Sequence, residues 1–124
     1  MSMPILDIER VLPEGADMPQ GLSQALADAA GSVLGSAPGH TWVRLRSLPA
    51  SAYAENGVPP DVNALPVFVT LLLAQAPQGE ALAAQVLALT RAIAHTLGID
   101  AARVHIQIAP PAAGRQAFGG GLVS

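Results

Sequence analysis

Hydrophobic and polar residues follow two different periods along the first half of the chain. Residues 4–12 (PILDIERVL) are rich in apolar side chains and stop at Pro13, which predicts a β-strand. Residues 18–35 then place apolar side chains at helical spacing, and residues 41–48 alternate between apolar and polar positions. The first half is therefore predicted to be strand, helix and strand. The apolar face of the predicted helix consists of Leu22, Leu26, Ala29, Val33 and Leu34.

The second half repeats this order of patterns. Residues 66–74 (PVFVTLLLA) are more uniformly apolar, so this strand is predicted to be buried on both faces. Residues 79–98 are predicted to form the second helix, and residues 103–110 (RVHIQIAP) alternate as the last long strand. The apolar stripe of the second helix consists of Leu82, Val86, Leu89, Ile93 and Leu97.

End signals accompany both predicted helices. Asp17, with Gln20 three residues later, resembles a capping box, and Pro19 fits the first turn of a helix. Gly35 and Gly98 stand where each helix should end, because glycine readily adopts the left-handed conformation of a C-terminal cap.

The two halves are predicted to be two βαβ units within a single domain, residues 1–124. The pseudo-repeats span residues 4–57 and 66–123, and residues 58–65 link them. Because βαβ crossovers are right-handed, the two strands of each unit are parallel. The expected fold class is α+β, with a four-stranded mixed sheet and two helices on one face. The other face of that sheet then needs a partner.

Composition supports such a partner and excludes several function classes. Hydrophobic residues make up 51% of the chain and charged residues 12%, against about 25% charged in average domains, which indicates a large subunit interface. The net charge of −3 argues against nucleic-acid binding. No apolar run approaches the ~20 residues of a membrane span, and no signal peptide is evident. We therefore expect a cytoplasmic protein without membrane or nucleic-acid partners.

The reactive side chains available to this chain are few. There is no cysteine, and all six basic residues are arginine, so disulfide, thiolate and lysine Schiff-base chemistry are absent. The three histidines do not stand at metal-ligand spacing. We expect neither a metal site nor a cofactor.

Polar side chains recur on one face of the two alternating strands. Arg44 and Arg46 share a face of the second strand, and His105 and Gln107 share a face of the last strand. Aligned as repeats, Arg44 matches His105 and Arg46 matches Gln107. Paired arginines can bind a carboxylate by two parallel hydrogen bonds. Equally, they can be a solvated face, or pair with Asp or Glu across a subunit contact.

Two aromatic residues are candidates for the wall of a small pocket. Phe118 precedes three glycines near the end of the chain, and Tyr53 occupies a similar place in the first half. The alternatives are a flexible tail or an edge hairpin added to a neighbouring subunit for Phe118, and a structural role for Tyr53.

Two βαβ units, Pro4 at the start of the first strand and the closing AFGG of residues 117–120 resemble the tautomerase superfamily. The length resembles the longer members, related to macrophage migration inhibitory factor and carboxymethyl-hydroxymuconate isomerase. Each half separately resembles 4-oxalocrotonate tautomerase. The resemblance covers residues 4–123.

The resemblance implies a homotrimer whose sheets form a central barrel with the helices outside. It also implies an N-terminal proline that acts as general base or acid on a small 2-oxo acid, and Pro4 is the matching residue. Residues 1–3 (Met-Ser-Met) precede it, and a proline that follows another residue has no basic nitrogen. Removal of Met3, if it is the natural start, would expose Pro4.

The resemblance also implies substrate-binding residues. Arg44 matches an arginine that binds the substrate carboxylate, and Phe118 matches an aromatic residue of the pocket. His105 and Gln107 stand where cytokine-like members have a tyrosine and an asparagine. Ser36 stands where those members have a pocket lysine. The phenylpyruvate-type pocket is therefore not reproduced.

Three functions follow from these residues. The first is a tautomerase in which Pro4 moves the proton and Arg44 holds the carboxylate, with help from His105, Gln107 or Arg115. The second is a hydratase, dehalogenase or decarboxylase of short unsaturated or oxo acids, with His105 or Tyr53 activating water. The third is a non-catalytic binding or structural trimer in which Pro4 stays internal.

Overall fold

A computed structural model describes residues 3–124, and the Met1–Ser2 part of the segment before Pro4 lies outside the described residues. All six predicted strands and helices are present; five are somewhat shorter than predicted, and the strand predicted at 41–48 lies one residue later. The main elements are β1 (Ile5–Leu12), α1 (Leu22–Leu34), β2 (Trp42–Pro49), β3 (Val67–Leu72), α2 (Gly79–Leu97) and β4 (Val104–Ile108). Short 3-10 turns, η1 (Ala50–Ala52) and η2 (Ala101–Arg103), and a small hairpin, β5 (Ala117–Phe118) with β6 (Gly121–Leu122), complete the chain.

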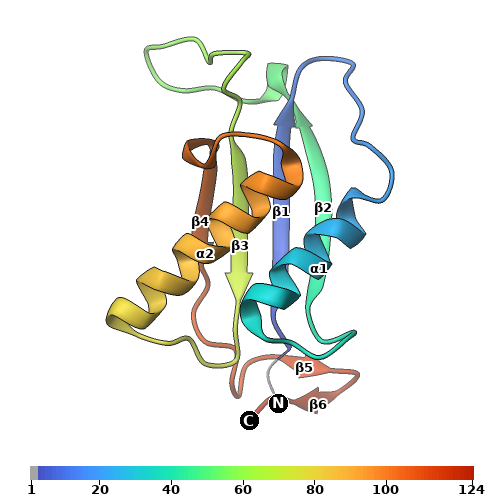
Figure 1. Cartoon of the computed structure of the whole chain (residues 1–124), viewed down its shortest axis with the longest axis vertical. Helices are drawn as coiled ribbons and strands as arrows, with labels where there is room; N and C mark the ends of the chain where they lie inside the picture. The colour runs from blue at the N-terminus through green and yellow to red at the C-terminus, as the bar shows by residue number, and fades with distance from the viewer. Residues whose placement is uncertain (1–2) are drawn as a thin grey trace.

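The four long strands form one mixed sheet in the order β2-β1-β3-β4. β1 is parallel to β2, β3 is parallel to β4, and β1 and β3 meet antiparallel at the centre. Both helices pack on the same face of this sheet (Figure 1). The predicted α+β class and its one-sided helical layer are confirmed.

The core lies between the sheet and the two helices. β3 shows the alternation most clearly, because Val67, Val69 and Leu71 are buried while Phe68 is 38% exposed. The prediction that this strand is buried on both faces is therefore wrong for the single chain, since both helices cover the same side of the sheet. The core cluster consists of Leu6, Ile8, Leu26, Ala30, Val67, Val69, Leu71, Leu73, Leu89, Ile93, Ala94, Leu97 and Val104.

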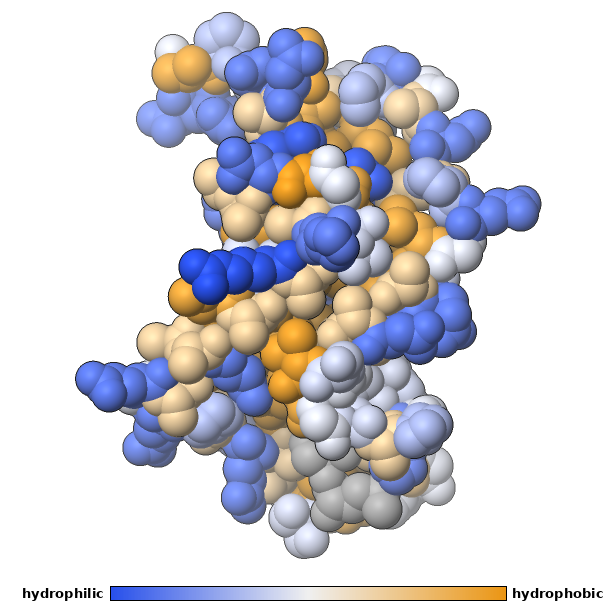
Figure 2. All heavy atoms as spheres, in the orientation of Figure 1, coloured by the Kyte–Doolittle hydropathy of each residue, from blue (hydrophilic) through white to orange (hydrophobic). Residues whose placement is uncertain are grey.

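The outer surface of the helical layer carries few charges. Figure 2 looks onto this layer and shows apolar side chains along much of both helices. Leu87 of α2 is 48% exposed there. The small charged fraction of the chain thus leaves apolar area uncovered on the helices.

Helix α1 begins later than its sequence signals predicted. Its N-terminal cap is Gly21 at φ 79°, without a hydrogen bond from any side chain, and the helix proper starts at Leu22. The predicted capping box of Asp17 and Gln20 is wrong, because the left-handed turn at Gly21 redirects the chain only after those residues. The predicted ends at Gly35 and Gly98 are confirmed, with φ of 66° and 67°.

One constant offset along the chain relates the two βαβ units. The number of residues that separates the two helix caps, Gly35 and Gly98, defines this offset. The same offset places the isolated bridge between Glu55 and Val58 on the Phe118–Gly121 pair of the β5–β6 hairpin. The first half therefore contains a minimal version of the C-terminal hairpin. Glu55, and not Tyr53 as predicted, is the counterpart of Phe118.

The same offset corrects the predicted matching of the strands. It places Arg44 on Gln107 and Trp42 on His105, so the alignment of Arg44 with His105 was wrong by two residues. Arg44 and Gln107 lie in one row across the open sheet, joined through Asp7 and Thr70. The offset places Asp7 on Thr70 and Arg44 on Gln107, so the pseudo-symmetry of the chain exchanges the two halves of this row.

Candidate active site on the open face of the sheet

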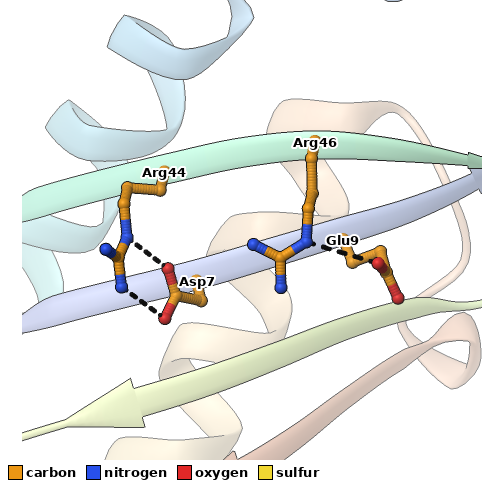
Figure 3. A network of polar contacts seen from close by, with 4 residues as sticks. All are labelled: Asp7, Glu9, Arg44 and Arg46. Carbon is orange, nitrogen blue, oxygen red and sulfur yellow. Dashed lines mark hydrogen bonds and ion pairs between the residues drawn. The ribbon is translucent and has the colours of Figure 1, made fainter.

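The face of the sheet away from the helices, called the open face below, carries two ion pairs between β1 and β2 (Figure 3). Arg44 donates from Nε to Asp7 Oδ1 at 2.5 Å and from an Nη to Oδ2 at 2.8 Å. Arg46 Nε donates to Glu9 Oε2 at 3.3 Å. These contacts follow from the parallel register, which sets Asp7 beside Arg44 and Glu9 beside Arg46.

The Asp7 contact changes what Arg44 can do. The hydrogen bond and the charge of Asp7 raise the pKa of Arg44, which stays protonated. A substrate carboxylate at Arg44 has to compete with a carboxylate that already occupies the guanidinium fork. The pair is solvent-exposed, so it orients the two side chains more than it stabilises the fold. Arg44 and Arg46 thus pair with acidic residues, as one of the alternatives from the sequence had it, but the partners belong to the same chain and not to a neighbouring subunit.

The open face has two ends of different composition. At the proline end, β1 and β2 start, β3 and β4 finish, and the β5–β6 hairpin lies nearby (Figure 1). Pro4, Trp42 and Phe118 gather there, because the Trp42 N–H bonds the Pro4 carbonyl and the Trp42 ring contacts Phe118. At the histidine end, β3 and β4 start, and Phe68, His105 and Tyr53 gather there. All four aromatic residues of the chain belong to one of these two ends.

Pro4 is buried at the start of β1. Its carbonyl accepts a hydrogen bond from the Trp42 N–H at 2.9 Å. The Trp42 indole in turn meets Phe118 edge to face, with ring centroids 5.1 Å apart and planes at 88°, a favoured aromatic geometry. Phe118 is part of a hairpin formed within its own chain, so the flexible-tail reading is wrong. The reading in which this hairpin adds to the edge of a neighbouring subunit stays a prediction.

A hollow of about 220 Å³ lies beside the proline end. Leu72, which forms part of it, stands opposite Ile5, the residue after Pro4. Arg115 and Gln116 line its polar side, with Pro110 among the apolar residues. Within residues 3–124, the two ion pairs leave Arg115 out. Its guanidinium is therefore available for a ligand carboxylate.

Ser36 lies in a different hollow, of about 390 Å³, between α1 and the segment that leads into β2. It accepts a hydrogen bond from the Thr41 hydroxyl at 2.5 Å, and Gln24 and Asp28 line the same hollow. Pro4 lines neither this hollow nor the one that holds Arg115. Thr41 of this hollow is followed by Trp42, whose N–H bonds the Pro4 carbonyl, so Ser36 also lies towards the proline end but in a separate hollow from Arg115.

At the histidine end, the Phe68 ring lies 5.7 Å from His105 and 6.0 Å from Tyr53, centroid to centroid. The Tyr53 hydroxyl donates to Glu55 at 2.6 Å, and this contact raises the pKa of Tyr53. Tyr53 therefore keeps its proton and suits a donor better than a base. Gln107 lies between the ends, in the row of Arg44.

One chain thus brings Pro4, Arg115 and Phe118 to one end of the sheet and leaves His105 and Tyr53 at the other. Sequence reasoning missed Asp7 and Glu9 as partners of the two arginines. The signal that could have found them is the parallel pairing of the βαβ unit, which sets alternate acidic residues beside alternate arginines.

Over residues 3–124, the structure has neither a cluster of metal ligands nor a membrane-spanning helix. In that range, no group of three or more His, Asp or Glu side chains is arranged to hold a metal ion. Nor does any helix there combine the length and apolar character needed to cross a membrane.

No protein-family model matches the chain, and no curated protein matches its sequence. Solved structures do match it. A wild-type fused 4-OT described as a symmetric trimer superposes with a TM-score of 0.72 at 24% identity, over 96% of this chain and 94% of its own. Pt0534 inactivated by 2-oxo-3-pentynoate matches at 0.71 and 20% identity, over 96% and 94%. Macrophage migration inhibitory factor from Oncomelania hupensis matches at 0.70 and 19% identity, over 97% of both chains.

Proposed function

Because the chain has the fold of the tautomerase superfamily, we propose that it is a cofactor-independent tautomerase that interconverts keto and enol forms of a small 2-oxo acid. The observation that carries this proposal is Pro4, buried at the start of β1, at the same end of the sheet as a hollow that includes Leu72 and the unpaired Arg115. The inactivation of Pt0534 by a 2-oxo acid supports the substrate class.

Pro4 does this chemistry as a free secondary amine. Free α-amino groups titrate near pH ~8, and burial near an arginine lowers that pKa towards neutrality. The amine takes a proton from the carbon next to the keto group, and the electron pair moves to the carbonyl oxygen. The protonated amine then gives that proton to the enolate oxygen, directly or through a water molecule, which restores the free amine. While Met3 is attached, the Pro4 nitrogen is an amide, so the proposal requires the preceding residues to be removed.

Arg115 is the proposed carboxylate anchor. It lines the hollow beside the strand that Pro4 begins, and none of the ion pairs among residues 3–124 occupies it. Arg44 is the alternative that the resemblance implies, and it has to release Asp7 first. Phe118 closes the same end through its contact with Trp42.

We further propose a homotrimer, in which the histidine end of one subunit completes the proline end of another. This supplies His105, Gln107 and Tyr53 to a pocket that a single chain leaves without them. Phe68, 38% exposed on the open face, would be covered in this contact. The description of a fused 4-OT as a symmetric trimer supports the arrangement.

The test uses the chain prepared with Pro4 as its first residue and 2-oxo-3-pentynoate as the probe. The amine nitrogen adds to the triple bond and its proton passes to the neighbouring carbon, so the mass rises by one probe molecule per chain. Peptide mapping should place the label on Pro4. Turnover of a phenylenolpyruvate-type substrate should fall roughly 10²–10⁴-fold in Pro4→Ala.

Pro66→Ala is the matched control, because Pro66 also precedes a strand but is bonded on both sides within the chain. It should keep both label and turnover. Labelling at other residues only, together with unchanged turnover in Pro4→Ala, would leave the non-catalytic trimer as the better account.

A further inference from the structure

Two arginines lie near each other at the histidine end, because Arg10 and the Val104 that follows Arg103 stand opposite the same residue, Val67 of β3. Arg10 continues the inward alternation of Leu6 and Ile8 along β1, and its Nε is buried without a hydrogen-bond partner. Arg103, in the turn before β4, donates from Nε to the Leu65 carbonyl at 2.8 Å. Neither arginine takes part in the two ion pairs formed within residues 3–124.

The pseudo-symmetry of the chain makes Arg10 unusual. The offset that relates Gly35 to Gly98 places Arg10 on Leu73, which is 5% exposed in the core. A position that is filled by a buried leucine in one half therefore carries a guanidinium in the other. Local conflicts of this kind, a partly buried charge at a position where the other half has a core leucine, are expected at functional sites.

The two guanidiniums also lack a counter-charge. Burial lowers the pKa of Arg10, and the positive charge of Arg103 lowers it further. Among residues 3–124, neither guanidinium forms an ion pair with a carboxylate. Leaving a partly buried charge unpaired costs free energy, and an anion between the two side chains removes that cost.

We propose that Arg10 and Arg103 form a binding site for an oxyanion, a carboxylate or phosphate group, at the end of the sheet opposite Pro4. The planar guanidinium fork matches such groups by paired hydrogen bonds. The proposal does not rest on the tautomerase activity, since neither arginine belongs to the proline end. The oxyanion comes either from a small molecule or from a carboxylate of a second copy of this chain.

The test is the thermal unfolding of the full chain in increasing inorganic phosphate, against sodium chloride at matched ionic strength. A ligand that binds only the folded state raises the unfolding midpoint in a saturable way. We expect phosphate to do so beyond chloride, and Arg10→Met to lose that shift. Without phosphate, Arg10→Met should unfold at a higher temperature than the wild type, because the unpaired charge is gone.

Arg91→Met, on the exposed surface of α2, is the matched control and should respond to phosphate as the wild type does. Arg103→Gln provides a second reading if Arg10→Met does not fold, and it should weaken the phosphate response. An equal phosphate shift in the wild type and in the foldable variants would overturn the proposal.

A second arm distinguishes the source of the oxyanion. The proposed homotrimer already makes the midpoint rise with protein concentration, so the readout is the difference between the wild type and the variants without phosphate. If the oxyanion is a carboxylate of another copy, Arg10→Met and Arg103→Gln weaken that dependence; if it is a small molecule, they leave it unchanged and lose only the phosphate shift. A wild type that does not respond to phosphate and whose concentration dependence equals that of both variants would show that the pair binds no oxyanion.

Discussion

The proline end and the histidine end of the open face share one backbone plan and differ in their side chains. Under the offset that relates the two halves, Trp42 corresponds to His105, and Phe118 corresponds to Glu55. The proline end is closed by an aromatic pair with a centroid distance of 5.1 Å. The histidine end has polar groups at the equivalent positions.

The starts of the two central strands differ in a way that matters for chemistry. Pro4 is equivalent to Val67 under the offset, and not to Pro66, so the two prolines occupy different positions relative to the sheet. A nitrogen in the middle of the chain is always an amide. Only the proline end could therefore present a basic amine, once the residues before Pro4 are removed, so the proposed proton transfer is confined to that end.

The strongest test of this comparison is whether the two ends meet in an assembly. Phe68→Glu places a charge in the proposed subunit contact, and burying an unpaired charge costs several kcal/mol per ion. Sedimentation equilibrium should report a mass near three chains for the wild type and near one chain for this variant. Because Phe68 is 38% exposed in the single chain, folding itself should tolerate the change.

The control for that experiment is Leu87→Glu, which introduces the same charge on the outer surface of α2, where Leu87 is 48% exposed. It should keep the mass of the wild type. If Leu87→Glu dissociates the assembly and Phe68→Glu does not, the helices and not the open face form the contact.

A second experiment asks whether the two halves contribute equally to the core. Leu26 of α1 and Leu89 of α2 are equivalent under the offset, and both are 0% exposed. Leu→Ala at a buried site costs about 2–5 kcal/mol through lost burial and the cavity left behind. Denaturant unfolding should place both variants in this range. A loss confined to one variant would show that only one half carries the core.

The fold was predictable because its signals are local. The helical spacing of apolar residues in α1 and α2, the alternation in β2 and β4, and the glycines at positions 35 and 98 each report on one element. Right-handed crossovers then leave few ways to arrange two such units. The order of the strands and the single helical layer follow from these rules.

The site was less predictable because it depends on pairing across strands. Alternation shows that Arg44 and Arg46 share a face, but it does not show that Asp7 stands beside Arg44. The two-residue error in matching His105 has the same origin, since side chains two apart on a strand share a face and alternation cannot separate them. The sequence likewise does not show that Arg10 Nε is buried without a hydrogen-bond partner, because that depends on how the strands and helices pack.

The smallest expected effect concerns the Tyr53–Glu55 contact of the histidine end, which has no titratable counterpart at the proline end. The hydrogen bond from Tyr53 to Glu55 raises the pKa of Tyr53 above its usual value of about 10. The small stability from this contact is present below the unfolded-state pKa and is lost as the pH rises through the folded-state pKa. Tyr53 is the sole tyrosine, so tyrosinate absorbance measures it alone. Glu55→Ala should move the titration of Tyr53 to lower pH. Glu14→Ala removes a carboxylate that contacts Ser51 instead, and it should leave the Tyr53 titration in place. Identical titrations in the wild type and both variants would mean that the Tyr53–Glu55 contact does not form in solution.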